Sequence, residues 1–367
     1  MTAAKPLTVT ILSPDPRIPG GVAVFIEAMR RALDRKVRTS YFLVGRRATD
    51  RSALTAAFNP FLDSFRLARH LLLMRPDVVH INPTLDFKSV LRDGLFLLVM
   101  RLFRKREVFM FIHGWEEGIS AVIAANPLWR TIFRFVYGWP RLTVVLAGRF
   151  RDQMVAMGFN PERIQVDSAM FDHTMFEGLT RKHHKDRRLV FVSRLVNDKG
   201  VWKVLEAYAA LKPRYPTLSL YIVGDGPERK GLVQAIAQRR IPDVVVTGYV
   251  SAAEKAQVLL DGDIFVFPTT AGEGCPATLL EAMAAGMPCV TTGVGGIPDV
   301  FVDGDNGIII DDVAPCTVEA AIVELLDDAQ RMADISEHNK QRAWEKYAAR
   351  PVTERIARRY FEVVAAR

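Results

Sequence analysis

The sequence predicts an α/β protein with two domains, each built on a parallel β-sheet that helices cover on both faces. Short apolar runs rich in Val, Ile and Phe alternate with helical patterns along the chain, as buried parallel strands and their crossover helices do. A length of 367 residues is enough for two cores. A hydrophobic content of 49% with 25% charged residues indicates a globular protein.

The first half of the chain supplies six expected strands, at residues 7–13, 39–44, 77–82, 107–113, 142–147 and 164–169. Helical patterns lie between them, and those at 64–75 and 89–106 mix apolar faces with Arg. Gly20 and Gly21 follow the first strand, where they either let a ligand or another domain approach the backbone or form an ordinary tight turn. They are not part of a GxGxxG fingerprint, which disfavours a dinucleotide site.

The second half repeats the alternation after a charged run at 179–188. Its expected strands and helices lie at 189–196, 201–212, 218–224, 244–248, 264–268, 277–286 and 307–311, with helical patterns at 317–328, 330–347 and 352–366. We therefore predict an N-terminal domain over 1–173 and a linker over 174–187, in which His183 and His184 are solvated. A C-terminal domain over 188–350 and a last segment over 351–367 follow.

The stretch from Pro268 to Pro298 combines a buried strand end, two acids and a helix start. Loops at the carboxyl ends of parallel strands bind ligands. Pro276 suits the first turn of a helix that ends near Gly286, and the N–H groups at this helix start would attract a phosphate. Glu273 precedes the helix, so neutral sugar hydroxyls suit it better than a phosphate. Glu281 lies on the helix itself.

Two further strand ends carry candidate site residues. Arg194 and Lys199 are five residues apart across a turn, so both cations can reach one anionic group. As an isolated pair they would be surface charges. His113 emerges at the end of the fourth strand, either as a ligand contact or as a structural hydrogen-bonding residue.

Glu273 and Glu281, together with PTTAGEG, AAGMPCV and GGIPD around them, resemble the Glu-x7-Glu signature of the family 4 retaining, nucleotide-sugar-dependent glycosyltransferases of group 1. The resemblance is sequence-specific over about 188–311 and implies the GT-B architecture. In that architecture two Rossmann-like domains face each other across a cleft, and the last segment crosses back to the N-terminal domain. The N-terminal domain would bind the acceptor and the C-terminal domain the donor.

The same resemblance implies a role for each matching residue. The first Glu would contact the donor sugar, with His113 near it, and the second would contact the ribose. Arg194 and Lys199 would hold the donor diphosphate, and the backbone after the strand at 244–248 would touch the nucleobase. The expected catalytic residues are Glu273, His113, Arg194 and Lys199, and the expected donor-binding residues are Gly20, Gly21, Arg194, Lys199, Tyr249, Val250, Glu273, Gly274, Cys275, Pro276, Ala277, Thr278 and Glu281.

We expect neither a cofactor nor a metal. We expect no Asp-x-Asp cluster to hold a divalent ion on the donor diphosphate, and Arg194, Lys199 and the helix start can neutralise the leaving group instead. Retention of configuration is implied by the resemblance alone. Two alternatives stay open: a nucleotide-sugar epimerase of the same design, and a catalytically silent sugar-binding subunit.

Charge divides unevenly along the chain. Residues 1–180 contain 25 Lys and Arg against 16 Asp and Glu, whereas the remainder has 24 against 25. A basic first half suggests an anionic membrane surface or a lipid-linked acceptor as its partner, and no nucleic-acid motif accompanies it. The helical pattern at 89–106 ends in Arg104, Lys105 and Arg106, either as a membrane-resting helix or as a buried crossover helix with a solvated end.

Three cysteines without metal-ligand spacing, and an N-terminus that enters a strand pattern at once, predict a cytoplasmic protein. The expected location is the cytoplasm, with peripheral attachment to the inner face of the membrane left open. We expect the chain to act in bacterial polysaccharide or glycolipid synthesis. The donor's base and sugar, the acceptor and the linkage are not specified by the sequence.

Overall fold

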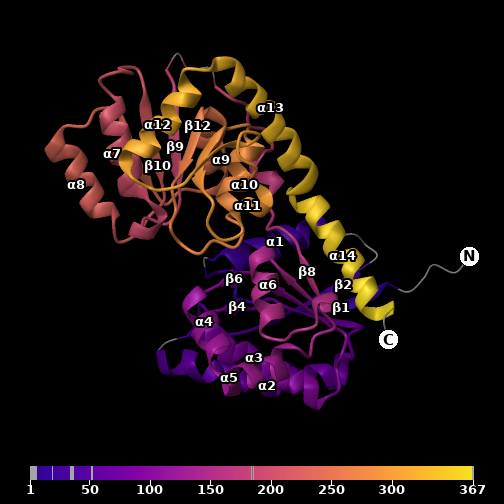
Figure 1. Ribbon diagram of the computed structural model, residues 1–367. Helices are drawn as coiled ribbons and strands as arrows, with labels where there is room; N and C mark the ends of the chain where they lie inside the picture. Colours follow the sequence, from indigo (N-terminus) through magenta and orange to yellow (C-terminus); the bar gives the residue numbers. More distant parts are fainter. Residues whose placement is uncertain are drawn as a thin grey trace, which may run out of the picture. The chain divides into compact units, whose positions relative to one another are not determined.

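A computed structural model of the chain describes residues 6–18, 20–33, 37–50, 53–182, 184 and 186–365. The chain forms two compact units, Met1–Ala169 with Ala349–Arg367, and Met170–Ala348 (Figure 1). The first stretch of this unit therefore ends at Ala169, four residues before the predicted boundary. The chain returns to the unit at Ala349, two residues earlier than predicted. Each unit has its own six-stranded parallel sheet, as the alternating pattern predicts.

The sheet of the first unit has the order β2-β1-β3-β5-β7-β8. Its strands are β1 Leu7–Ser13, β2 Val37–Leu43, β3 Val78–Ile81, β5 Val108–Ile112, β7 Leu142–Val145 and β8 Ile164–Val166. A two-stranded pair, β4 Thr84–Leu85 and β6 Gly114–Trp115, extends beyond β3 and β5. All five residues of β5 are buried, because helices cover both faces of the sheet.

Helices of the first unit are α1 Gly21–Ala32, α2 Ala53–Met74, α3 Phe87–Leu102, α4 Glu117–Ala125, α5 Pro127–Tyr137, α6 Gly148–Ala156 and α14 Ala349–Ala365. Apolar side chains of α2, α3, α5 and α6 share one core cluster with the strands. The last helix, α14, packs instead against α1, β3 and β5. In that contact the hydroxyl of Tyr360 lies 2.6 Å from Nδ1 of His80, and both side chains are buried.

The sheet of the second unit has the order β11-β10-β9-β12-β13-β14. Its strands are β9 Arg188–Val192, β10 Ser219–Val223, β11 Val244–Gly248, β12 Ile264–Phe267, β13 Cys289–Thr292 and β14 Gly307–Ile310. Its helices are α7 Val201–Leu211, α8 Arg229–Arg239, α9 Ala252–Asp261, α10 Ala277–Ala284, α11 Ile297–Val300, α12 Pro315–Leu326 and α13 Ala329–Lys346. The central strands β9 and β12 pair in parallel, so their carboxyl ends reach the same edge.

One cation at the basic end of the helical pattern at 89–106 is held by backbone carbonyls of the first unit. Helix α3 stops at Leu102, so Arg104, Lys105 and Arg106 follow the helix instead of extending it. The Lys105 ammonium donates to the carbonyls of Pro76 and Asp77, at 2.7 and 2.9 Å. Arg104 and Arg106 stay exposed, as the expected solvated end of a crossover helix does, and only Lys105 is held by the fold.

Candidate functional site

The stretch around Glu273 connects strand β12 to helix α10. All four residues of β12 are buried, and the loop from Thr269 to Gly274 leaves its carboxyl end. Helix α10 then begins at Ala277 and is followed by Gly286, whose φ of +79° ends it as predicted. Pro276 is the extended residue before the helix instead of part of its first turn, since its ψ is 114°.

Lys199 and Glu273 form an ion pair at the carboxyl ends of β9 and β12. The Lys199 Nζ lies 2.5 Å from Glu273 Oε1, and both side chains are mostly shielded from solvent. Lys199 ends a short 3₁₀ turn, η3 Asn197–Lys199, that follows β9. The carbonyl of Asp198 in this turn accepts from the Thr270 N–H at 2.8 Å and the Thr269 hydroxyl at 3.2 Å. The two strand-end loops are therefore bound together.

A glycine turn after β13 supports the backbone of Glu273. The N–H of Gly296 donates to the Glu273 carbonyl at 2.8 Å. Gly295 has a φ of +61°, and a Cβ there would lie 1.7 Å from the same carbonyl oxygen. Only glycine allows this approach. The sequence shows the Gly-Gly pair, but its contact with a residue 22 positions earlier is a tertiary feature without a local signal.

Glu281 is buried on the inner side of α10 and pairs with Lys255 of α9. The Lys255 Nζ lies 2.7 Å from Glu281 Oε1. Burial raises the pKa of the Glu281 carboxyl, and the Lys255 charge opposes this effect. Within the described part of the chain, Glu281 Oε2 has no hydrogen-bond partner. A buried carboxylate oxygen without a partner is suited to accept a hydrogen bond from a ligand.

A pocket of about 480 Å³ adjoins this site. Arg194 lines it together with Lys203 of α7 and Thr270 of the loop after β12. The structure therefore brings the predicted cation Arg194 to the same loop that holds Glu273. Lys203 was missed by the sequence reasoning, although it lies one helical turn beyond Lys199 and could have been considered with it.

The start of α10 has the properties of an anion site. No side chain caps this helix, and Pro276 at the cap has no N–H of its own. Ala277 is exposed and Thr278 is half-buried, so their backbone is accessible, whereas Cys275 is buried. The predicted phosphate attraction at this helix start is thus compatible with the geometry.

The other predicted donor contacts of the second unit are less constrained. Gly274 is half-buried within the loop before α10. Tyr249 follows β11 and is 79% exposed, and Val250 beside it is half-buried. The structure places both after a strand of the same sheet, and their contact with a nucleobase stays a prediction.

In the first unit, His113 is held in one protonation state and orientation. The Asn82 amide donates to the Leu12 carbonyl at 3.1 Å, which turns its Oδ1 toward His113 Nε2 at 2.9 Å. His113 Nε2 therefore carries the hydrogen. Burial beside Phe25 and Phe111 lowers the pKa of His113 to about 3. The imidazole is neutral at pH 7, and Nδ1 can accept a hydrogen bond.

Gly20 and Gly21 begin helix α1 of the same unit. A Cβ at either position would have no heavy atom within 4 Å, so the fold itself does not require glycine there. Gly20 is in extended backbone that any residue adopts. Close approach of a ligand stays the predicted reason for these glycines.

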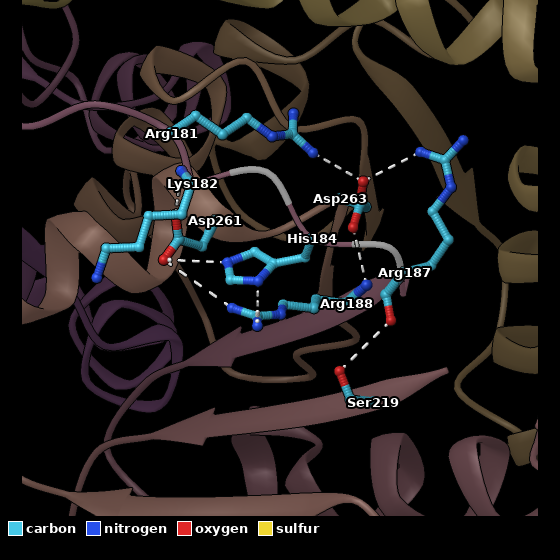
Figure 2. A network of polar contacts seen from close by, with 8 residues as sticks. All are labelled: Arg181, Lys182, His184, Arg187, Arg188, Ser219, Asp261 and Asp263. Carbon is cyan, nitrogen blue, oxygen red and sulfur yellow. Dashed lines mark hydrogen bonds and ion pairs between the residues drawn. The ribbon is translucent and has the colours of Figure 1, made fainter. Parts of the chain in front are cut away.

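Residues 174–187, which we predicted as a linker between the domains, belong to the second unit. Figure 2 shows how the charged run binds two buried acids at the amino ends of β9 and β12. Asp263 accepts from Arg181 at 2.8 Å and Arg187 at 3.0 Å, and Asp261 lies 3.6 Å from His184 Nε2. His184 is exposed, as predicted for a solvated residue, although its ring also lies beside Arg188 and Asp261, and His183 lies outside the described residues.

Asp261 and Asp263 also form an Asp-x-Asp pair, so the sequence does contain this motif, away from the expected diphosphate site. The pair lies at the edge of the sheet opposite to Glu273 and is already neutralised by these cations. A second pair, Asp303 and Asp305, lies before β14, where Asp303 accepts from the Ile309 N–H. Across the described ranges, no three His, Cys, Asp or Glu side chains gather as a metal-binding group.

Residues 177–342 match the family model described as glycosyl transferases group 1. The chain is 34% identical over 179 residues to the GDP-mannose-dependent alpha-mannosyltransferase of Corynebacterium glutamicum, a match that covers 48% of this chain and 40% of that protein. It is 28% identical over 298 residues to the GDP-mannose-dependent alpha-(1-6)-phosphatidylinositol monomannoside mannosyltransferase of Mycolicibacterium smegmatis, covering 73% and 77%.

Among solved structures, the Anabaena protein Alr3699/HepE in complex with UDP matches 97% of this chain and 100% of its own, with a TM-score of 0.74. The sequence identity is 14%, so this likeness concerns the fold. The chain spans about half the length of several curated relatives that it matches, 51%, 55% and 40%.

Proposed function

We propose that this chain, whose residues 177–342 match the family model of the glycosyl transferases group 1, transfers a sugar from a nucleotide-diphosphate sugar to a saccharide or lipid-linked saccharide. The observation that carries this proposal is the Lys199–Glu273 pair beside the uncapped start of α10. It places a cation, a carboxylate and accessible N–H groups at one edge of a parallel sheet. These groups match a diphosphate and a sugar.

The residues of the second unit divide between the parts of the donor. Lys199 has three hydrogens on Nζ, so it can stay bound to Glu273 and also donate to a phosphate oxygen. Arg194 and the start of α10 add positive charge for the same diphosphate. Glu273 accepts from sugar hydroxyls, and the unpartnered Oε2 of Glu281 accepts from the ribose. Tyr249 and Val250 contribute backbone contacts to the base.

The proposed reaction retains the configuration of the sugar and needs no metal. The bond between the anomeric carbon and the diphosphate oxygen breaks while Arg194 and Lys199 stabilise the departing charge. The acceptor hydroxyl bonds to the anomeric carbon from the same face, and its proton passes to the departing phosphate oxygen. His113 accepts a hydrogen bond from a sugar hydroxyl through its neutral Nδ1, since it carries no charge near pH 7.

We place the activity in the cytoplasm, in polysaccharide or glycolipid synthesis, with an acceptor near an anionic membrane surface. The name of the Mycolicibacterium smegmatis relative contains a phosphatidylinositol monomannoside, which supports a lipid-linked acceptor. The basic first half of the chain supports an anionic acceptor. Across the described residues no helix combines the length and apolar character that crossing a bilayer requires.

The test is a screen of UDP- and GDP-sugars for binding and hydrolysis, with and without a chelator. We expect at least one donor to bind equally well in chelator, and Lys199→Ala to weaken its binding by about tenfold to a hundredfold, as expected for the loss of a charge-assisted contact. Arg214→Ala serves as the control, because Arg214 pairs with exposed Asp327 on the surface of the same unit.

Three results would contradict parts of the proposal. Normal donor binding by Lys199→Ala would remove the diphosphate assignment, and loss of binding in chelator would remove metal independence. An epimerised donor formed without acceptor would identify an epimerase instead. The anomeric configuration of the product, measured by NMR, decides between retention and inversion.

A further inference from the structure

Large exposed apolar side chains gather on four neighbouring helices of the first unit. Of the 25 such side chains in the described part of the chain, 17 lie between Phe58 and Phe135. Helix α2 packs on α3, α3 on α5 and α5 on α4, so these four helices are neighbours in the first unit (Figure 1). Single exposed apolar residues are ordinary, but a continuous group marks an interaction surface.

Helix α5 shows most clearly that this surface is not core. Phe133, Val136 and Tyr137 are buried on its inner side. Leu128, Ile132 and Phe135, which are spaced by four and three residues, form an outer row with exposures of 67%, 44% and 52%. A helix facing water would be polar on this outer side. The outer row therefore fits an apolar partner.

The outward charges on three of these helices are of one sign, and the fourth, α4, carries only Glu117, which pairs with Arg149. Helices α2, α3 and α5 carry the cations Arg66, Arg69, Lys88, Arg92, Arg101, Arg130 and Arg134. Their two acids, Asp63 and Asp93, are buried and paired. Asp63 accepts from the Gly45 N–H and from Arg47, and Asp93 accepts from Arg92 at 2.8 Å. The outward charge of these three helices is therefore entirely positive.

We propose that this basic apolar face, formed by Phe61, Phe65, Leu102, Leu128 and Trp129 with Arg66, Arg69, Arg130 and Arg134, docks on an anionic lipid bilayer. Apolar and aromatic side chains enter the boundary between headgroups and acyl chains, and the arginines contact lipid phosphates. A second copy of the chain fits less well, because it would bring cations against cations. The inference rests on the proposed function for its link to a lipid-linked acceptor.

The test is co-sedimentation of the full chain with vesicles of phosphatidylcholine, with and without phosphatidylglycerol. We expect binding to the anionic vesicles that weakens with added salt. The double variant Phe65→Glu with Trp129→Glu should lower the bound fraction by about tenfold or more, because two charges enter the apolar region. Both residues are more than half exposed, so the melting temperature should stay near that of the wild type.

The matched control is Val233→Glu, which adds a charge at a 48% exposed apolar residue of α8 in the second unit. It should bind vesicles like the wild type. The proposal is overturned if the wild type stays in the supernatant, or if the double variant binds as well as the control. It is also overturned if sedimentation equilibrium shows a dimer that the double variant dissociates while no vesicles bind.

Donor hydrolysis separates this proposal from the enzymatic one. Vesicle binding requires no donor, and hydrolysis of the nucleotide sugar requires no vesicle. A chain that binds vesicles but hydrolyses no donor contradicts the proposed function alone. A chain that hydrolyses donor but ignores anionic vesicles contradicts only the docking face.

Discussion

The charge state of Glu281 depends on one neighbour, Lys255. Burial raises the pKa of this carboxyl, and the ammonium 2.7 Å away favours the ionised form. We expect Lys255→Met to raise the pKa of Glu281 further and to weaken nucleotide binding at pH 7 by about tenfold, because a neutral carboxyl is a poorer acceptor. Titration calorimetry with UDP and GDP measures this.

Because protonation of Glu281 should weaken binding, the pH dependence of the nucleotide affinity gives that experiment a second readout. Affinity lost through protonation should return in part as the pH rises toward 9, whereas a merely structural defect would not recover. Lys230→Met is the control, since Lys230 is an exposed residue of α8. Equal affinities of Lys255→Met and the wild type across this range would show that Glu281 does not act as a carboxylate in binding.

The position of Glu273 depends on Gly295. A Cβ at this residue would lie 1.7 Å from the Glu273 carbonyl oxygen, so Gly295→Ala must displace the loop that carries the acid. Gly304 also has a positive φ, of +83°, but a Cβ there meets nothing within 4 Å. Gly304→Ala should therefore cost only the backbone strain, about 1–2 kcal/mol. We expect Gly295→Ala to lower kcat/KM for donor turnover by about tenfold or more beyond this control. Equal turnover would contradict the role of Gly295.

At the scale of elements, most strands and helices could be predicted because their signals are local. The run Ile264–Phe267, the helix after Pro276 and the end at Gly286 each follow from residues within one or two turns. The pairing of Glu281 with Lys255 of α9 could not be predicted in this way, because it joins two helices. Similarly, the charged run at 179–188 has a linker composition, and the ion pairs of its Arg181 and Arg187 with the buried Asp263 depend on a tertiary contact without a local signal.

Helix α14 secures the C-terminal end of the chain to the first unit. The Tyr360 hydroxyl lies 2.6 Å from His80 Nδ1, and His80 Nε2 has no partner within the described part of the chain. Tyr360→Phe would leave both nitrogens of a buried imidazole unpaired. We expect the free energy of unfolding to fall by about 1–3 kcal/mol. Urea denaturation measures this against Phe361→Tyr, a change at a 46% exposed residue of the same helix. A loss no larger than in the control would show that the hydroxyl contributes little.

At the scale of the whole molecule, buried histidines should make stability depend on pH in mild acid. Burial lowers the pKa of His113 to about 3, and it also lowers the pKa values of His80 and His70. In the unfolded chain these side chains titrate near 6.5, so below that pH the unfolded state binds protons that the folded state does not. Stability is therefore fully present above about pH 6.5 and falls as the pH drops toward 3.

Between pH 6.5 and 5 the buried histidines act against Glu281 and Asp93, whose raised pKa values add stability as the pH falls, so a histidine variant is needed to identify the histidine contribution. The carboxyls whose pKa values are lowered by arginine partners, such as Asp15 and Asp167, lose their contribution only at lower pH. We expect the urea midpoint to decrease steadily from pH 7 to pH 5, and His113→Gln to flatten the decrease, since glutamine can donate to Asn82 without titrating. If the midpoint of His113→Gln changed with pH as that of the wild type does, His113 would make no contribution, and its assignment as a buried neutral group would be wrong.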